Sequence, residues 1–422
     1  MNRRKTGIIG GGASGLMAAV SAAQGKGGPG DEVVILEKKE RIGKKILVTG
    51  NGRCNLTNLS FSMDKIGEYY HGAPARRLRS MFARFSPEDT LRLFEEMGML
   101  TTSRDGYVYP LSGQASTVLD TLRFELERLG VSVLTDCQIR ELLPRRGGGF
   151  LVRMQSVQNA REEELAFDRL IVACGSPAGQ KAGEGMDGYA FAKSLGHSVI
   201  RPQPALTALR CEGDFWKGLA GVRCAASVRL SVPQEARAAW TEEGELQLTD
   251  YGISGIPVFQ LSRHASLALA KGKRVQARID FLPSFPGKQE EYEKMAERRI
   301  TVCRGRSMEV LFCGLVNKKI ILTLLKKNGL KLQDTVNEGN REAARRVFGD
   351  LRAFSVRVRS ANPFGSAQVC AGGVPLEEVT DRLESVRHPG LYFAGELLDV
   401  DGRCGGYNLQ WAWTSGFLAG KG

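Results

Sequence analysis

The stretch "KTGIIGGGASGLMAAVSAAQ", residues 5–24, decides the fold of the first domain. It opens as a short apolar strand, and its later Ala and Leu spacing fits a helix packed closely on a sheet. Between them stands G-x-G-x-x-G, in which Gly10 would make the tight turn, Gly12 would let the backbone approach a pyrophosphate and Gly15 would permit close helix–strand packing. The stretch therefore predicts a dinucleotide-binding βαβ unit.

The second strand of this unit, "DEVVILE" at residues 31–37, ends in an acid. Glu37 follows Gly15 by 22 residues, near the usual position of a carboxylate that binds a ribose hydroxyl and disfavours a 2′-phosphate. The N–H groups of Ala13 and Ser14, at the start of the helix, would hold the phosphates. A glycine-rich turn without a nucleotide is the alternative, but strand, glycines, helix, strand and acid together favour the nucleotide.

A loop rich in Gly, Asn and basic residues, "RIGKKILVTGNGRCNLTN" at residues 41–58, follows the acid. Its irregular backbone and clustered donors would suit a loop wrapped around a dinucleotide, although any polar turn has a similar composition. The residues of this loop that we predict to bind the cofactor are Lys44, Asn51, Arg53, Cys54 and Asn55.

Length and composition indicate an ordinary globular protein. The chain has 422 residues, 42% hydrophobic and 25% charged, and is long enough for two or three domains. Its nine cysteines include no C-x-x-C pair, which argues against a zinc ribbon and a secreted disulfide framework and suits a reducing cytoplasm. The basic start could pass for a leader peptide, but the glycines that follow fit an apolar leader core poorly. We expect no metal site and no membrane span, since no other apolar run approaches the ~18 residues that a span needs.

The net charge of +13 predicts attraction to polyanions. The excess is uneven, because residues 290–359 hold sixteen Lys and Arg against nine Asp and Glu. A basic patch there would bind nucleic acid, whereas a solvated helical face in a basic protein would have the same composition.

The C-terminal stretch "GLYFAGELLDVDGRCGGYNLQWAWTSGFLAG", residues 390–420, combines a strand, a glycine-rich segment and a closing aromatic stretch. Together with the N-terminal GGGxSG and "KILVTGNGRCNLTN", it resembles the bacterial YhiN/BaiN-type flavoproteins, also described as NAD(P)/FAD-dependent or aminoacetone-oxidase-like oxidoreductases. The resemblance spans essentially the whole chain and includes "LTDYGISGIPVFQLSR". Two departures are Cys174-Gly175-Ser176, where Thr-Gly-Gly is expected, and Asp250, where the family usually has His. The second argues against a His-based role at that position.

The resemblance implies FAD as the cofactor and places the C-terminal segment against it. Gly395 and Glu396 would meet the ribityl chain, and the glycines of residues 402–406 would let the backbone pass against the isoalloxazine ring. A helix over residues 408–417 would follow, with its first N–H groups facing the flavin N1–C2=O edge, where they would stabilise the reduced anionic flavin. The remaining positions predicted to bind the cofactor are Gly175, Gly406, Tyr407, Asn408 and Leu409.

We expect an α/β fold in which a discontinuous Rossmann-like FAD-binding domain carries an insertion. The insertion would begin as a β-barrel-like substrate domain, because "CAASVRLSV", "GELQLTDYGISG" and "RVQARIDFL" alternate like strands, and would continue as a small basic helical subdomain. In the first domain Ser86 should cap a helix, and "VSVLTDCQI", residues 131–139, should form one strand. The expected boundaries are 1–193 with 355–422 for the first domain, 194–285 with 350–354 for the second and 286–349 for the third.

Few side chains offer themselves for catalysis, because the flavin supplies the redox chemistry and the protein need only add position, charge and a proton donor. The candidate proton donors are Tyr407, Tyr251 and Cys404. Cys54 and Cys404 both lie in loops expected near the flavin, but flavin disulfide reductases use two closely spaced cysteines, so we expect inert thiols. His197 is expected to be a structural residue at a helix end.

The leading hypothesis is an NAD(P)H-linked, FAD-dependent reductase of a C=C bond conjugated to a carbonyl. The family is linked to 3-oxo-Δ4 or Δ4,6 bile-acid rings, to dihydrouridine formation in ribosomal RNA and to oxidation of small amines such as aminoacetone. A small apolar carbonyl substrate would need an apolar pocket between the first and inserted domains. RNA would use the basic segment, and a non-enzymatic flavin-containing RNA-binding protein is a further alternative.

Overall fold

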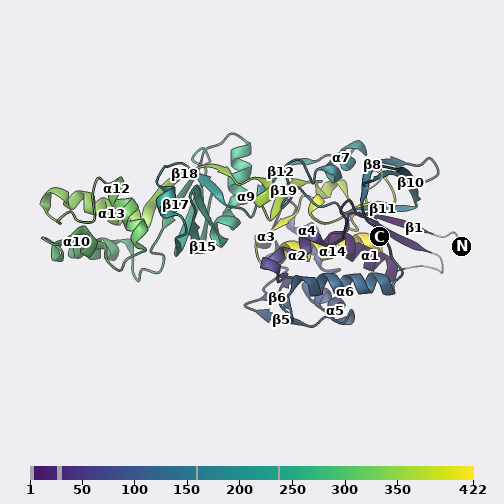
Figure 1. Ribbon diagram of the computed structural model, residues 1–422, viewed down its shortest axis with the longest axis horizontal. Helices are drawn as coiled ribbons and strands as arrows, with labels where there is room; N and C mark the ends of the chain where they lie inside the picture. The colour runs from purple at the N-terminus through teal and green to yellow at the C-terminus, as the bar shows by residue number, and fades with distance from the viewer. Residues whose placement is uncertain (1–3, 26–30, 158–159, 236–237) are drawn as a thin grey trace. The chain divides into compact units, whose positions relative to one another are not determined.

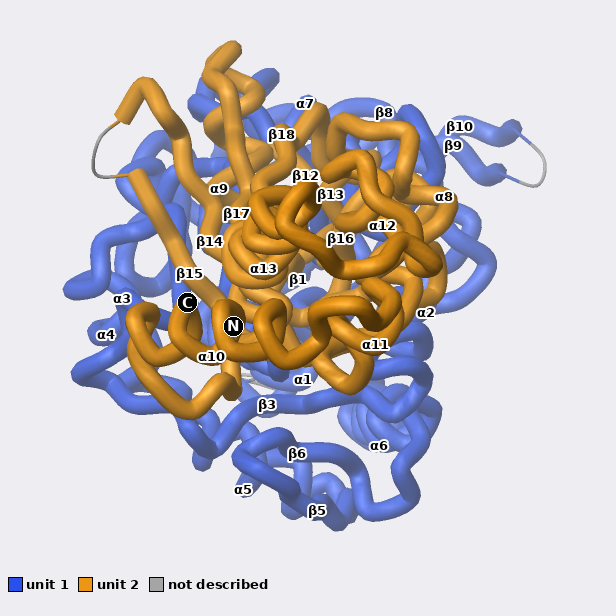
Figure 2. The backbone as a smooth tube through the Cα atoms, turned by 90° about the vertical axis from the view of Figure 1, so that its left-hand side faces the viewer, with its two compact units in different colours: residues 1–202, 369–422 blue, residues 203–368 orange. Residues whose placement is uncertain are grey.

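The computed structural model describes residues 4–25, 31–157, 160–235 and 238–422. Met1–Arg3, the first three residues of the basic start weighed as a leader peptide, lie outside these ranges. The chain divides into two compact units, unit 1 over residues 1–202 and 369–422 and unit 2 over residues 203–368 (Figure 2). The boundaries expected from the sequence were 193/194 and 354/355.

Unit 1 is built on a five-stranded parallel sheet of order β20-β11-β1-β2-β7. The strands β1 and β2 belong to the N-terminal glycine segment, whereas β20 comes from the C-terminal stretch. Parallel strands with both faces covered are typical of doubly wound α/β folds. The bounds are β1 Lys5–Ile9, β2 Glu32–Leu36, β7 Ser132–Leu134, β11 Arg169–Val172 and β20 Leu391–Phe393.

Alternate residues of the sheet enter two different hydrophobic cores. In β1, Ile8 packs into one core and Ile9 into the other, and in β20 Tyr392 and Phe393 divide in the same way. Since successive side chains of a strand point to opposite faces, the sheet is a middle layer between two apolar layers. This explains why its strands are continuous apolar runs in the sequence.

The helix α14, Tyr407–Lys421, packs along α1, Ala13–Gln24, on one face of this sheet (Figure 1). A Cβ at Gly416 would lie 2.3 Å from the Ser14 carbonyl oxygen, and one at Gly420 would lie 2.6 Å from that of Ala18. The two helices therefore meet backbone to backbone, which larger residues at these two glycines would prevent. This contact joins the two ends of the chain in one domain.

Smaller elements surround the sheet of unit 1. Ser86 begins α5 with a capping box shared with Asp89, as predicted. The predicted strand over residues 131–139 is wrong as one element, because Asp136 adopts φ 56° and breaks it between β7 and β8. The bounds are α2 Lys44–Leu47, β3 Thr57–Asn58, α3 Ile66–Tyr69, β4 Tyr70–His71, α4 Ala75–Phe82, α5 Pro87–Glu96, β5 Thr101–Arg104, β6 Tyr107–Pro110, α6 Ala115–Arg128, β8 Cys137–Pro144, β9 Phe150–Ser156, β10 Glu162–Phe167, α7 Asp187–Ser194 and β21 Asp401–Gly402.

Unit 2 contains a closed six-stranded barrel of order β13-β16-β15-β14-β17-β18, which confirms the expected inserted barrel. The stretch "GELQLTDYGISG" contributes two of its strands, because a turn over residues 249–251 separates β15 from β16. The strands alternate buried and exposed residues, as in β17, where Val275, Ala277 and Ile279 are buried. The bounds are β13 Leu209–Cys211, β14 Arg223–Ser231, β15 Ala239–Leu248, β16 Gly252–Gly255, α9 Ile256–Ala270, β17 Val275–Asp280 and β18 Phe354–Ala361.

The basic helical region and the barrel share one hydrophobic core. Tyr292 donates its hydroxyl to the Phe348 carbonyl at 2.9 Å, and Phe281 N donates to the Leu351 carbonyl at the same distance. The region is therefore packed onto the barrel as part of unit 2. Its helices are α10 Gln289–Val302, α11 Met308–Phe312, α12 Lys318–Lys327 and α13 Arg341–Ala353. The strands β12, Ile200–Ala205, and β19, Val369–Gly373, pair with each other where the chain passes from one unit to the other.

Candidate functional site

The glycines of the G-x-G-x-x-G motif differ in how much room the protein leaves beside them. A Cβ at Gly15 would lie 1.9 Å from the Gly10 carbonyl oxygen, and one at Gly10 would lie 2.5 Å from that of Ala173. A Cβ at Gly12 would meet no atom within 4 Å. Gly12 also precedes α1 without a side-chain cap. The start of α1 is thus open space with uncapped N–H groups, the setting that suits a bound phosphate.

Glu37, directly after β2, is held in place by two backbone donors. Its Oε2 accepts from Gly11 N at 2.7 Å and its Oε1 from Lys39 N at 2.8 Å. The hydrogen bond from Gly11 ties the carboxylate to the glycine turn. The predicted acid and the predicted phosphate turn are therefore adjacent in space, and each carboxylate oxygen retains a lone pair for a hydroxyl.

The loop of residues 41–58 has an unusual backbone. Asn51 and Cys54 adopt φ values of 55° and 58°, which non-glycine residues seldom do. Such conformations cost about 1–3 kcal/mol each and concentrate at functional sites. The Arg53 guanidinium lies over the Tyr109 ring at 5.4 Å, and Lys44 pairs with Glu40 at 2.6 Å.

Lys45, a basic residue of this loop that is not among the predicted cofactor-binding residues, connects the loop to the C-terminal segment. Its Nζ donates to Glu396 Oε2 at 2.6 Å, while Cys370 N donates to Glu396 Oε1 at 2.9 Å. Lys44 and Lys45 are neighbouring residues of the same type in the short helix α2. Their side chains leave this helix in different directions, so Lys44 pairs with Glu40 and Lys45 with Glu396. No signal in the sequence would have distinguished the two.

Gly395, which follows β20, packs against the first turn of α1. A Cβ there would lie 2.3 Å from Ser14 Oγ, and its φ of 74° favours glycine. Its N–H donates to Ser415 Oγ at 2.9 Å, and its carbonyl accepts from Trp411 Nε1 at 3.1 Å. The structure therefore brings the predicted ribityl segment to the predicted phosphate turn.

The glycines before α14 lie on the loop of residues 41–58. Asn58 Nδ2 donates to the Gly405 carbonyl at 2.8 Å, and a Cβ at Gly406 would lie 2.6 Å from the Thr57 carbonyl oxygen. Asn55 donates its amide to Thr57 O at 3.0 Å and accepts from Gly406 N at 3.2 Å, the amide orientation that satisfies both groups. The loop and the start of α14 thus form one structure.

The helix α14 begins at Tyr407, one residue before the predicted start, and Leu409 is partly buried against the core around α1. The Asn408 side chain accepts from Gly402 N and donates to the Gly402 carbonyl, each at 2.8 Å. These bonds close the segment of residues 402–406 into a compact loop. Gly402 is therefore fixed by a side chain rather than by sheet pairing alone.

Tyr407 lies at the centre of an aromatic cluster. Its ring stacks on Tyr69 with centroids 4.9 Å apart, and Tyr70 donates its hydroxyl to the Tyr407 carbonyl at 2.9 Å. Burial raises the pKa of Tyr407 to about 12, so the phenol keeps its proton at neutral pH. Within the described residues its hydroxyl makes no hydrogen bond to the protein. This leaves the phenol proton available for another acceptor.

The cysteines near this region are not activated. Burial raises the pKa of Cys54 to about 11 and also raises the pKa of Cys404. A redox-active cysteine needs a lowered pKa, because the thiolate is the reactive form. Cys174 is similar, with a pKa raised to about 12 by burial, and the neighbouring Gly175 adopts φ 70° with no atom within 4 Å of its Cβ position.

Two predicted residues lie elsewhere. Tyr251 belongs to unit 2, in the turn before β16. His197 is buried in unit 1 between Glu378 Oε2 at 3.0 Å and Ser385 Oγ at 2.9 Å, and burial lowers its pKa despite the adjacent carboxylate. His197 is therefore a structural residue, as expected. A hollow of about 500 Å³ lined by Leu142, Phe191 and His388, among others, includes none of the predicted site residues.

The arrangement of the glycine turn, the acid and the returning C-terminal strand has a counterpart among known proteins. The model of the HI0933-like protein Rossmann domain matches residues 4–422. The chain belongs to the HI0933-like family. The resemblance inferred from the sequence motifs is thus confirmed.

Curated relatives of this HI0933-like chain include two kinds of enzyme. The chain is 42% identical over 422 residues to the 3-dehydro-bile acid delta(4,6)-reductase of Clostridium scindens, a match that covers 100% of this chain and 98% of the relative. It is 26% identical over 415 residues to the ribosomal RNA dihydrouridine synthase of Haemophilus influenzae, a match that covers 97% and 96%. Both alignments are essentially full length.

Solved flavoprotein structures share the fold of this HI0933-like chain. The 3-ketosteroid-delta4-(5alpha)-dehydrogenase from Rhodococcus jostii, in complex with 4-androstene-3,17-dione, aligns with a TM-score of 0.51 at 14% identity over 99% of this chain and 96% of that chain. E. coli quinol fumarate reductase FrdA aligns with a TM-score of 0.52 at 15% identity over 100% and 69%. At such identities the similarity concerns the fold.

The described residues of this HI0933-like chain show neither a membrane-spanning helix nor a metal-binding cluster. None of its helices there combines the length and the apolar character needed to cross a membrane. Within the same ranges, no group of three or more His, Cys, Asp and Glu side chains is arranged to hold a metal ion.

Proposed function

We propose that unit 1 binds FAD through the segments that surround the start of α1. Gly12, Ala13, Ser14 and Gly15 would hold the pyrophosphate, because the first turn of α1 is uncapped and a Cβ at Gly12 would occupy open space. Glu37, fixed by two backbone donors, would accept from a ribose hydroxyl. The uncapped helix start and the fixed carboxylate support this proposal.

The other end of the cofactor would lie along the C-terminal segment. Gly395 and Glu396 would face the ribityl chain, since both follow β20 and Gly395 packs against Ser14 in the first turn of α1. The N–H groups at Tyr407, Asn408 and Leu409 would face the flavin and favour its reduced anionic form. The further positions proposed to border the cofactor are Lys44, Asn51, Arg53, Cys54, Asn55, Gly175 and Gly406.

The proposed reaction is reduction of a C=C bond conjugated to a carbonyl in a 3-oxo-Δ4 or Δ4,6 bile acid or a similar steroid. The observation that carries this proposal is the 42% identity, over the full length, to the Clostridium scindens bile-acid reductase. The bound flavin would supply the hydride to the β carbon. The chain itself must then orient the substrate, exclude water and provide a proton for the α carbon.

Tyr407 is the proposed proton donor. Its phenol keeps its proton at neutral pH, makes no hydrogen bond within the described residues and belongs to the unit that would hold the flavin. A neutral phenol so placed can release a proton as charge develops on the substrate. Tyr251 and Cys404 are the other candidates, and conservative variants of all three distinguish them.

The proposed reductant is NADH or NADPH. The sequence holds one dinucleotide fingerprint, at residues 10–15, which the FAD would occupy. The nicotinamide would therefore bind transiently against the flavin. A reducing cytoplasm is the proposed location, since the nine cysteines are free thiols in the structure.

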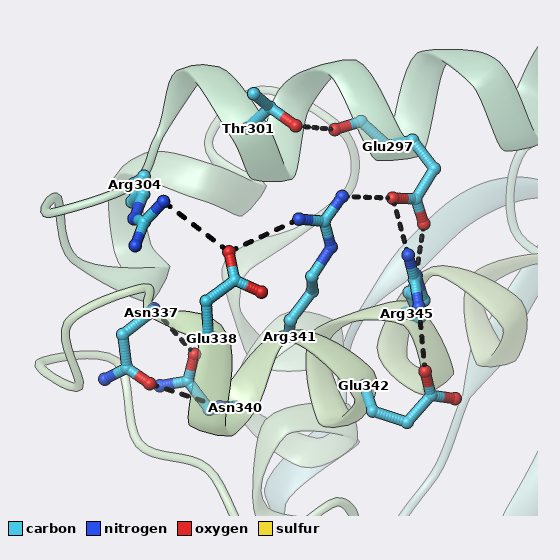
Figure 3. Close-up of polar contacts among 9 residues, drawn as sticks. All are labelled: Glu297, Thr301, Arg304, Asn337, Glu338, Asn340, Arg341, Glu342 and Arg345. Carbon is cyan, nitrogen blue, oxygen red and sulfur yellow. Dashed lines mark hydrogen bonds and ion pairs between the residues drawn. The ribbon is translucent and has the colours of Figure 1, made fainter.

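Ribosomal RNA is the second candidate substrate, because unit 2 concentrates the positive charge. It holds 27 Lys and Arg against 17 Asp and Glu, a net charge of +10. Its helical region, however, pairs several of its arginines internally (Figure 3). Arg341 and Arg345 both bind Glu297, whose pKa is lowered to about 2 by the hydrogen bond from Arg345, and Arg304 pairs with Glu338 at 3.6 Å. These arginines have protein partners and are less available to phosphates.

Anaerobic stopped-flow on the flavin-loaded protein tests the proposal. The flavin is reduced with NADH or NADPH, and its reoxidation is followed at ~450 nm with a 3-oxo-Δ4,6 bile acid and, separately, with ribosomal RNA. Rapid reoxidation by the bile acid, with the loss of one C=C bond for each flavin oxidised, is expected. Reoxidation by RNA alone would make unit 2 an RNA platform, and reoxidation by O2 alone would favour an amine oxidase acting on substrates such as aminoacetone.

A further inference from the structure

The Glu396 side chain of unit 1 is held by donors from two segments that are far apart in the sequence. Lys45 Nζ, on the short helix α2, donates to its Oε2 at 2.6 Å, and the backbone N of Cys370, on β19, donates to its Oε1 at 2.9 Å. The preceding residue is fixed as well, since Gly395 N donates to Ser415 Oγ at 2.9 Å. The protein itself therefore sets the direction of this carboxylate.

Both carboxylate oxygens of Glu396 keep a free acceptor position. An ionised carboxylate has about four lone-pair sites. The described residues fill one site on each oxygen, through Lys45 and through Cys370 N. Hydroxyl groups, which can donate, are suitable partners for the remaining sites, and the ribityl chain proposed to face Glu396 consists of such groups.

The acid of the Lys45–Glu396 pair is more buried than the acid of the neighbouring pair on the same helix. The Glu396 side chain is 19% exposed, whereas that of Glu40, the partner of Lys44, is 59% exposed. Solvent and salt screen a partly buried charge less than an exposed one. A change of charge at Lys45 or Glu396 therefore acts more strongly on nearby groups than a change at the exposed pair.

The Cys370 thiol experiences both charges of the pair. Burial is the main cause that raises its pKa to about 12, and of the two charges Glu396 raises the pKa further whereas Lys45 lowers it. Within the described residues, Lys45 is the one cation whose nitrogen lies within 4.0 Å of a Glu396 oxygen. Lys45 therefore offsets the negative charge of Glu396 at its neighbours.

This charge balance matters because reduction adds charge to a flavin. Reduction to the anionic form takes up two electrons and one proton, so the flavin gains one negative charge. A carboxylate without a counter-ion at the ribityl chain would oppose that gain, and a cation beside the carboxylate reduces the opposition. Lys45 is suited to this role through the carboxylate that it neutralises.

We propose that Lys45 is a positioning residue that orients the Glu396 carboxylate, neutralises its charge and thereby raises the reduction potential of the FAD bound to unit 1. The proposal rests on the FAD site proposed above and adds the group that sets the balance between oxidised and reduced cofactor. The residues concerned, Lys45, Cys370 and Glu396, all belong to unit 1.

The test compares the midpoint potential of the bound flavin in the wild-type holoenzyme and in variants, by equilibrating the flavin absorbance with reference redox dyes. We expect Lys45→Gln to weaken the binding of reduced FAD about tenfold more than that of oxidised FAD, the lower end of what a neighbouring charge does to an ionisation equilibrium. Tenfold corresponds to about 30 mV for a two-electron couple, so the midpoint potential should fall by that amount. Lys45→Arg, which retains the charge, should keep the wild-type potential.

Further variants separate the effect of charge from that of structure. Glu396→Gln removes the acid and should shift the potential upwards, and the double variant Lys45→Gln/Glu396→Gln should return it close to the wild-type value. Lys5→Gln is the matched control and should leave the potential unchanged. Lys5 pairs with Glu32 at 3.5 Å and begins β1, at the opposite end of this strand from the glycine turn.

Equal weakening of the two redox forms by Lys45→Gln, with an unchanged potential, would indicate a structural role and overturn the inference. A fall of the potential in Glu396→Gln as well as in Lys45→Gln would also overturn it, because removal of opposite charges must act in opposite directions. If Lys45→Gln retains no flavin, the potential of Glu396→Gln decides, and a value that does not rise rejects the inference.

The same measurements distinguish this inference from the proposed function. If the wild-type apoprotein binds no FAD, the proposed site and the role of Lys45 fail together. If it binds FAD but does not reduce the bile acid, only the proposed reaction fails, and the potentials of the Lys45 and Glu396 variants decide the inference by themselves.

Discussion

The candidate sites of the two units consist of different chemical groups, mainly backbone groups in unit 1 and side chains in unit 2. In unit 1 the groups that would hold FAD are backbone N–H groups and glycines, and the net charge of the unit is +3, from 32 Lys and Arg against 29 Asp and Glu. In unit 2 the candidate group is the Tyr251 side chain, which Asn362 joins to Arg210 in one hydrogen-bonded cluster, and the net charge of this unit is +10. A site made of backbone is encoded by short motifs and tolerates few side chains. A site made of side chains depends on which strands become neighbours.

The largest effect is expected from side chains added to the backbone site of unit 1. Gly12→Val should abolish FAD binding and leave the apoprotein folded, because its Cβ would enter open space that only the pyrophosphate would fill. The measurement is the ratio of flavin to protein absorbance after purification, with thermal unfolding of the apoprotein. Gly15→Val is the contrasting variant and should prevent folding, since its Cβ would lie 1.9 Å from the Gly10 carbonyl oxygen. Stoichiometric flavin in Gly12→Val would refute the site assignment.

The next effect tests whether unit 1 also supplies the proton. Tyr407→Phe should lower the rate of flavin reoxidation by the bile acid by about 10²-fold or more, the usual contribution of a general acid. The flavin content should not change, because the ring and its stacking on Tyr69 are retained. Tyr69→Phe is the control in the same cluster. A normal rate in Tyr407→Phe combined with a slow rate in Tyr251→Phe would move the proton donor to unit 2.

A smaller effect is expected from the Glu37 side chain, which is proposed to bind the ribose. Glu37→Gln should weaken FAD binding about tenfold, or ~1.4 kcal/mol, because a charge-assisted bond to the ribose becomes a neutral one. Equilibrium dialysis or fluorescence titration of the apoprotein measures the change. Glu40→Gln, an exposed neighbour that pairs with Lys44, should leave the affinity unchanged. An unchanged affinity in Glu37→Gln would remove its ribose role.

The smallest effects are expected from acid titration of one carboxylate in each unit. Burial alone would raise the pKa of Glu378 in unit 1, but hydrogen bonds from Ser198, Arg387 and His197 outweigh it and hold the pKa at about 2. In unit 2 the hydrogen bond from Arg345 lowers the pKa of Glu297 to about 2. Both values lie below the usual 4.5, so the stabilisation is complete above pH 4.5 and is lost as the pH falls towards 2.

Thermal unfolding of Glu378→Gln and Glu297→Gln across this pH range checks the comparison. The difference in Tm between the wild type and each variant should shrink as the pH falls below 4.5. Glu378→Gln should have the larger effect, because the Glu378 side chain is 12% exposed and that of Glu297 is 38% exposed. Added salt should reduce the Glu297 effect more. A Tm difference that does not vary with pH would show that protonation of these two carboxylates does not change the stability of the fold.

The fold and the first site were predictable because their determinants are local in the sequence. The glycine turn, the acid at Glu37 and the cap at Ser86 each occupy a few consecutive residues, and the resemblance of the two chain ends indicated that they meet. The strand break at Asp136 was not predictable, because a left-handed aspartate has no sequence signature. The choice of Lys45 over Lys44 as the partner of Glu396 depends on a single helical turn.

The cluster of Arg210, Tyr251 and Asn362 was beyond sequence reasoning for a different reason. Tyr251 was noted only as a possible proton donor, and neither partner belongs to a motif. The three residues become neighbours because β13 pairs with both β16 and β18 when the barrel closes. Pairing of strands this distant in the chain is specified by the whole barrel and not by any one segment.

Because α14 packs against α1, unit 1 can finish folding only after the last helix has been synthesised. Unit 2 is one continuous segment, whereas unit 1 lacks β20 and α14 until the ribosome has passed residue 421. About 200 residues separate the end of the first part of unit 1 from α14, which at 5–20 residues per second is a delay of roughly 10–40 s. During that interval α1 lacks the helix that covers it, and the inserted unit can fold before the domain that carries it. Nascent chains should therefore acquire flavin only after α14 has been synthesised and has packed on α1.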